Sequence, residues 1–88
     1  MNNLILVKYK NLSAHVSEND FSSIKNRLRS KSKSELEMFI KSVISCLERQ
    51  VVKVDKKEYI SPQERIDTAT DIAIFCVYTS SIMRYVND

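Results

Sequence analysis

Hydrophobic residues recur every three to four positions along most of the chain, the spacing that places side chains on one face of an α-helix. The clearest such stripe begins after Ser32 and Glu35, which have the S-x-x-E spacing of a capping box and can satisfy free backbone N–H groups at a helix start. Polar and charged residues occupy the opposite face. The pattern predicts a helix over residues 33–50. Its stripe consists of Leu36, Phe39, Ile40, Val43, Ile44, Leu47 and Val51.

A shorter helix is predicted over residues 18–29. Ser17 is suited to the N-cap, and the acidic residues that follow it lie where the helix dipole favours negative charge. Phe21, Ile24 and Leu28 form a narrow apolar stripe. Because a narrow stripe covers only part of a core, we expect this helix at the periphery of the fold.

The C-terminal segment predicts the longest helix, over residues 62–86. Ser61 as N-cap, Pro62 at the first helical position and Glu64 after it form a strong start signal. The apolar residues form two adjacent stripes that together span about 200° of the helix, twice the arc of an ordinary surface helix. We therefore expect a central helix, packed by several neighbours or by a second copy of itself. One stripe holds Ile66, Ala69, Ala73, Cys76, Val77 and Met83, and the other Ile72, Phe75, Ile82 and Val86.

Two segments are ambiguous. Residues 3–9 fit either a short strand or the first turns of a helix, because seven residues are too few for the period to decide. Residues 51–60 fit a small hairpin or a fraying helix followed by a linker, and we favour the linker. The chain contains no Gly, the residue that hairpin turns most often use for positive φ. The predicted fold is therefore a single all-α domain over residues 1–88, a bundle of three helices or four elements around the long C-terminal helix.

Composition limits the class of protein. The apolar fraction of 43% and the charged fraction of 28% are ordinary for a soluble globular domain. The longest apolar run, residues 72–78, is far shorter than the ~20 residues that a membrane helix needs. No basic region precedes the apolar N-terminal stretch, so we expect no signal peptide and a cytoplasmic protein. Cys46 and Cys76 stand far apart without a neighbouring His, which predicts unpaired, buried thiols and no zinc site.

Charge is unevenly distributed along the chain. Residues 1–34 carry seven basic and two acidic side chains, a net charge of +5, whereas residues 35–88 carry seven and nine, a net charge of −2. Part of the excess lies in a basic segment, which we define as Lys25, Arg27, Arg29, Lys31 and Lys33. Such a segment fits a site for nucleic acid or for an acidic protein, and equally a solvated helix end. A helix–turn–helix reading is disfavoured, because Glu35 and Glu37 would face the phosphates.

A possible interaction surface lies on the last helix. Ile74, Tyr78 and Tyr85 share its third face with polar groups, and Tyr is favoured at interfaces because its ring is apolar and its hydroxyl polar. Phe75 and Ile82 of the second stripe would stay exposed in an isolated three-helix bundle. These five residues form the predicted partner-binding surface, and a homodimer is its simplest closure. The alternative is that the N-terminal segment of the same chain covers them.

Residues with catalytic or metal-binding chemistry are sparse. His15 is the only histidine, Asp67 and Asp71 are too few for a calcium site, and a chain without Gly has no phosphate-binding loop. We therefore expect no enzyme, no metal and no cofactor. The sequence favours a small non-enzymatic protein-binding module, such as a regulator, an inhibitor, an immunity protein or a secretion-associated factor. The alternatives are a nucleic-acid-binding protein that uses the basic segment, and a small enzyme whose site the sequence does not connect.

Overall fold

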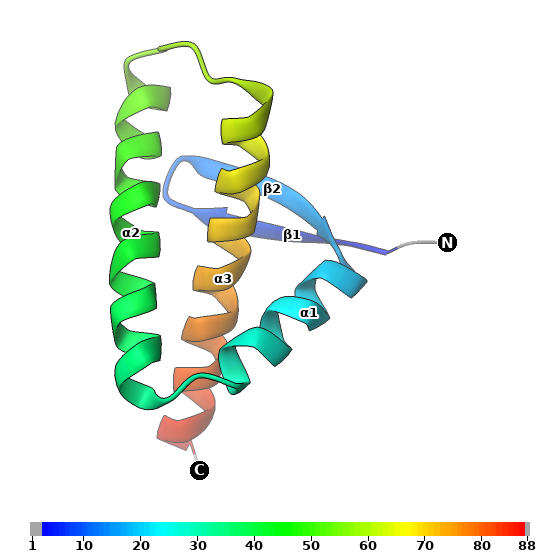
Figure 1. Cartoon of the computed structure of the whole chain (residues 1–88). Helices are drawn as coiled ribbons and strands as arrows, with labels where there is room; N and C mark the ends of the chain where they lie inside the picture. Colours follow the sequence, from blue (N-terminus) through cyan, green and yellow to red (C-terminus); the bar gives the residue numbers. More distant parts are fainter. Residues whose placement is uncertain (1–2, 88) are drawn as a thin grey trace.

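The computed structural model describes residues 3–87, with side chains described for residues 3–80. Two strands, β1 (Leu4–Tyr9) and β2 (Leu12–Ser17), are followed by three helices, α1 (Glu18–Arg29), α2 (Lys33–Asp55) and α3 (Pro62–Asn87). The strand hairpin crosses α3, while α2 runs beside α3 in the opposite direction (Figure 1). The fold is therefore an α+β arrangement, and the predicted all-α bundle is wrong.

The hairpin forms because residues 4–17 alternate between apolar and polar positions. β1 and β2 pair antiparallel, with Tyr9 opposite Leu12 at the turn and Leu4 opposite Ser17 at the far end. Val7, Tyr9, Leu12 and Val16 point to one face and are buried there. Successive strand residues point to opposite faces, so this one face joins the core. Of the two readings of residues 3–9, the strand is the one observed, whereas its partner over residues 12–17 was not predicted.

The turn of the hairpin explains why the absence of glycine misled the prediction. Lys10 has φ 51°, a left-handed conformation that costs a non-glycine residue roughly 1–2 kcal/mol. Contacts with α2 hold the turn in place. Lys10 Nζ donates a hydrogen bond to Glu48 Oε1 at 2.6 Å, and Asn11 Nδ2 donates to Asp55 Oδ1 at 2.8 Å and to the carbonyl of Val51 at 3.3 Å. Tertiary contacts thus offset a cost that local sequence chemistry alone does not.

The three helices begin where the sequence predicts. The hydroxyl oxygens of Ser17, Ser32 and Ser61 accept hydrogen bonds from the backbone N–H groups three residues later, at 3.1, 3.2 and 3.1 Å. Each serine therefore satisfies one of the free donors of a helix start. The bounds of α1 agree with the predicted residues 18–29, and the backbone of α3 follows the predicted residues 62–86 closely.

The end of α2 differs from the prediction. The helix continues past residue 50 to Asp55, so residues 51–55 are helical and only the residues after them form a connection. Lys57 has φ 56°, its N–H donates to the carbonyl of Val54 at 3.1 Å, and the N–H of Glu58 donates to that of Lys53 at 2.9 Å. This pair of bonds is a Schellman motif, which usually has Gly where Lys57 lies. The absence of glycine concealed the end of this helix as well.

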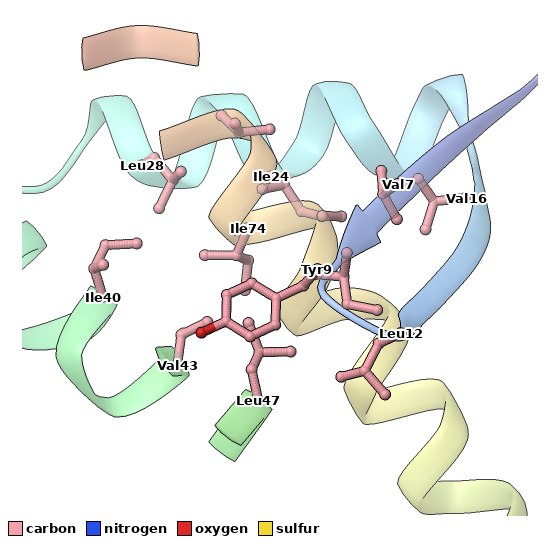
Figure 2. Packing of buried hydrophobic residues seen from close by; sticks show 13 residues of the cluster. Val7, Tyr9, Leu12, Val16, Ile24, Leu28, Ile40, Val43, Leu47 and Ile74 are labelled. Atoms are coloured by element: carbon pink, nitrogen blue, oxygen red, sulfur yellow. The ribbon is translucent and has the colours of Figure 1, made fainter. Parts of the chain in front are cut away.

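The core surrounds α3, which contacts α1, α2 and both strands. Figure 2 shows the Tyr9 ring among Ile74 of α3 and Val43 and Leu47 of α2. The hairpin thus covers a side of α3 for which the sequence left two alternatives open, a partner or the N-terminal segment of the same chain. The buried residues are Val7, Tyr9, Leu12, Val16, Ile24, Leu28, Ile40, Val43, Leu47, Ile72, Ala73, Ile74 and Val77.

Both cysteines are unpaired, as predicted, but they are half-buried and not fully buried. Cys46 Sγ lies 3.2 Å from Arg49 Nη2 on the same helix. Cys76 Sγ donates to the carbonyl of Lys8 at 3.7 Å, which ties α3 to β1. His15 is exposed.

Candidate functional site

Of the predicted partner-binding surface on α3, the three residues whose side chains are described, Ile74, Phe75 and Tyr78, pack against the chain itself. Ile74 is only 3% exposed and belongs to the core. Phe75 is half-buried and meets Tyr9 of β1 edge to face, with ring centroids 4.9 Å apart and an interplanar angle of 87°. Tyr78 is also half-buried and packs against the core. The side chains of Ile82 and Tyr85 lie outside the described residues. For Ile74 and Phe75, the hairpin is the neighbour that a three-helix prediction lacked.

The basic segment occupies the end of α1 and the turn into α2. Lys25, Arg27, Arg29 and Lys33 are exposed, and Lys31 is half-buried. Arg27 and Arg29 lie in the last turn of α1, where the helix dipole favours positive charge. The ammonium groups of Lys25 and Lys31 lie 5.2 Å and 4.8 Å from the ring centroids of Phe21 and Phe39. Among residues 3–80, none of the five forms an ion pair.

The hairpin has a free edge along β2. In an antiparallel pair, residues that hydrogen-bond to each other alternate with residues whose backbone groups point away from the partner strand. Tyr9 and Leu12 close the turn as a bonded pair, so the backbone groups of Ser13 and His15 point away from β1. The N–H of Glu18 donates to the carbonyl of Asn3 at 3.3 Å. This bond agrees with the alternation, because residues 3 and 18 are the next pair beyond Leu4 and Ser17.

No backbone group within residues 3–87 pairs with the free edge of β2. The opposite edge differs, because the carbonyl of Lys8 on β1 accepts from Cys76 of α3. β2 lies on the side of the hairpin nearer the α2–α3 connection (Figure 1). A strand edge with unpaired N–H and C=O groups is a template for a further strand.

Two leucines extend the uncovered surface around the hairpin. Leu4 is 63% exposed and Leu6 is 50% exposed, on the face of β1 that points away from the core. Their neighbours across the sheet are Ser17 and His15, which are polar. The outer face of the hairpin therefore combines apolar and hydrogen-bonding groups, a mixture that protein interfaces share.

A cleft of about 410 Å³ lies beside the start of β2, at the end of the molecule where α2 and α3 are connected. Its volume is within the range of ligand-binding clefts. Apolar side chains from β2, α2, α3 and the connection line it together with amides and hydroxyls. Among the described residues of the lining, Arg65 is the only charged one. The residues are Asn11, Leu12, Ser13, Ala14, Gln50, Val54, Ile60, Arg65, Thr68, Ala69 and Ile72.

Arg65 is exposed, and its guanidinium has no hydrogen bond or ion pair with any side chain of residues 3–80. The neighbouring Glu64 is instead bound to α2, because its carboxylate accepts from Lys53 Nζ at 2.7 Å and from Gln50 Nε2 at 3.1 Å. These partners lower the pKa of Glu64 to about 2, with Lys53 the larger cause. Ion pairing therefore fixes the start of α3 against α2 and leaves Arg65 available.

The turn end of the hairpin is held to α2 by a second polar cluster. Tyr9 Oη donates to Glu48 Oε1 at 2.5 Å, beside the bond from Lys10. The hydrogen bond from Lys10 is the main cause that lowers the pKa of Glu48, and the bond to Glu48 is the main cause that raises the pKa of Tyr9. Because these contacts join strand to helix, we interpret the cluster as structural, and it positions the start of β2 beside the cleft.

The described carboxylates of α3 are not grouped with enough other metal-ligating side chains to surround an ion. Asp67 accepts a hydrogen bond from Gln63 Nε2 at 3.0 Å, and burial, followed by the charge of Asp67, raises the pKa of Asp71. Within the described part of the chain, no group of three or more His, Cys, Asp or Glu side chains is arranged to hold a metal ion. Of the described helices, none has the length and apolarity needed to cross a membrane.

No known family model, curated protein or solved structure matches this chain. The free edge of β2 and Arg65 were not among the predicted site residues. A signal for the edge was present in the alternation of Leu12, Ala14 and Val16 with polar residues. Nothing in the sequence around Arg65 distinguishes it from the other basic residues.

Proposed function

We propose that the protein is a non-enzymatic module that binds another protein through the uncovered side of its hairpin. The observation that supports this proposal is the free edge of β2 beside an open cleft. Proteins commonly bind extended partner segments by adding them as a strand to such an edge, where main-chain hydrogen bonds supply affinity and pockets supply specificity. A regulator or an inhibitor that captures one segment of its target fits this geometry.

The hairpin replaces the last helix as the proposed binding surface. The expected homodimer depended on an apolar arc of α3 left uncovered by two other helices. The hairpin and α1 supply the missing cover over residues 72–78, which are buried or half-buried. A second copy bound through the hairpin is therefore a distinguishable outcome of the tests below and not a requirement of the fold. The unpaired thiols of Cys46 and Cys76 favour a reducing compartment, so we propose a cytoplasmic location.

His15 allows a sharp test, because its N–H points away from β1. Proline removes that donor and adds bulk at the free edge, while the ladder between the strands keeps its bonds. The control is His15→Ala, which keeps the N–H. Affinity capture from the native host, with mass spectrometry and then purified components, should recover one partner with the wild type and with His15→Ala but not with His15→Pro. Equal recovery by His15→Pro, with both variants folded by circular dichroism, would contradict the proposal.

A second candidate is nucleic-acid binding through the basic segment, favoured by five basic side chains without ion-pair partners among residues 3–80. Affinity for DNA or RNA would then fall steeply with salt, with a slope of about −0.9 for each phosphate neutralised on a duplex. Replacing Lys25, Arg27, Arg29, Lys31 and Lys33 together with Ser should leave the fold intact. The replacement would flatten that slope by roughly 4–5. An unchanged affinity in the variant would eliminate this candidate.

A further inference from the structure

We infer that the partner supplies an extended segment that carries a carboxylate, and that this segment joins β2 as a third strand with the carboxylate on Arg65. This inference rests on the proposed function and specifies the chemistry of its binding site. It combines three features: the unpaired backbone of β2, the apolar cleft beside it and the guanidinium on the rim of that cleft.

The backbone of β2 fixes the direction in which the segment lies. Ser13 and His15 present N–H and C=O groups away from β1, at the two-residue spacing that an added strand requires. Ser13 also lines the cleft. An added strand therefore runs along the mouth of the cleft, so that its alternate side chains point toward the layer of helices.

The cleft suits the apolar side chains of such a segment. Leu12, Ala69 and Ile72 are buried or half-buried and contribute its apolar wall, and Val54 and Ile60 extend it toward the connection. A volume of about 410 Å³ accommodates one or two side chains of the added strand but not a second layer of secondary structure. The site is thus better matched to an extended segment than to a helix.

Charge decides between a foreign segment and a second copy. Arg65 is the only charged group in the part of the lining that the structure describes, and a guanidinium binds a carboxylate through two parallel hydrogen bonds. Thr68, another residue of the lining, carries a hydroxyl that can also donate a hydrogen bond. β2 contains no Asp or Glu, so a second copy paired strand to strand would bring no carboxylate from β2 to Arg65. A segment with Asp, Glu or a free C-terminus supplies the missing partner.

The test uses a random heptapeptide library, displayed on phage and selected on the wild-type protein. We expect enrichment of peptides that alternate apolar residues and share one Asp or Glu. The best peptide is then synthesised and titrated by fluorescence anisotropy. Its affinity should fall at least about tenfold on Arg65→Gln, the loss typical of a hydrogen bond to a charged group. Arg29→Gln, an exposed arginine near the opposite end of α2, should leave the affinity unchanged.

A second arm changes the peptide instead of the protein. Replacing the acidic residue of the peptide with the matching amide should lower its affinity for the wild-type protein by the same factor. The same replacement should leave its affinity for the Arg65→Gln variant almost unchanged. Amide NMR signals of Ser13 and His15 should shift on peptide addition. No enriched peptide, enrichment without an acidic residue, or equal affinity for the wild type and Arg65→Gln would each overturn the inference. A doubling of mass without peptide, lost in His15→Pro, would overturn it in favour of a second copy.

The two proposals fail separately. Peptides that shift the amide signals of Ser13 and His15 but bind Arg65→Gln as tightly as the wild type would support strand addition. They would contradict the binding of a carboxylate by Arg65. A partner captured from the host equally by His15→Ala and His15→Pro would remove strand addition itself, whatever the library selects.

Discussion

Replacement of Lys57 with Gly should stabilise the protein. Lys57 holds the left-handed position of the Schellman motif that ends α2, with φ 56°. A side chain in that conformation costs roughly 1–2 kcal/mol, which Gly avoids. The greater freedom of Gly in the unfolded chain offsets about 0.5–1 kcal/mol of this gain. The net increase in the free energy of unfolding should therefore be about 0.5–1 kcal/mol.

The neighbouring residue provides a matched control. Lys56 is also an exposed lysine, but it has φ −83° in the ordinary helical region. Lys56→Gly removes no strain and should lower the free energy of unfolding by about 0.5–1 kcal/mol. Two adjacent and chemically identical substitutions should thus have opposite signs.

Urea denaturation followed by circular dichroism measures both changes. With an m-value of about 1 kcal/mol/M, Lys57→Gly should raise the midpoint by roughly 0.5 M or more and Lys56→Gly should lower it by a similar amount. The reasoning would be refuted if both variants were destabilised equally, because Lys57 would then not have the left-handed conformation that terminates α2.

Two further predictions concern packing and pH. Leu47→Ala, at a fully buried position, should lower the free energy of unfolding by about 2–5 kcal/mol. Val52→Ala, at an exposed position of the same helix, should lower it by much less. Similar losses for the two variants in urea denaturation would contradict the burial of Leu47 in the core. Because Lys53 and Gln50 lower the pKa of Glu64 from its ordinary 4.5 to about 2, the stabilisation is complete above the ordinary value and disappears as the pH falls through about 2. The melting temperature of Glu64→Gln should therefore lie below that of the wild type near pH 7 and converge with it near pH 2, whereas a constant difference would argue against the ion pair.

The helices were predictable from the sequence because their signals are local. A serine followed by an acidic residue three positions later marks the starts of α1, α2 and α3, and each hydroxyl makes the predicted bond. Their ends were less predictable. α2 ends at Asp55, and the motif that terminates it has Lys57 in a conformation that usually requires Gly, so no residue type marked this end in the sequence.

The hairpin and the candidate site were not predictable for a tertiary reason. The positive φ of Lys10 is supported by the contacts of the turn with Glu48 and Asp55, residues that lie far along the chain. A prediction without the hairpin therefore places Ile74 and Phe75 on a binding surface. The same omission concealed the edge of β2. The cleft also needs residues from four parts of the chain, which no single window of sequence contains.

Amide hydrogen exchange along β2, measured residue by residue on the free protein by NMR, tests the central claim of a paired hairpin with an open edge. The N–H groups of Leu12, Ala14 and Val16 point to β1 and should exchange slowly. Those of Ser13 and His15 should exchange rapidly and become protected only when a partner segment binds. Uniformly rapid exchange would contradict the hairpin, and slow exchange at Ser13 and His15 in the free protein would show that the edge is already covered.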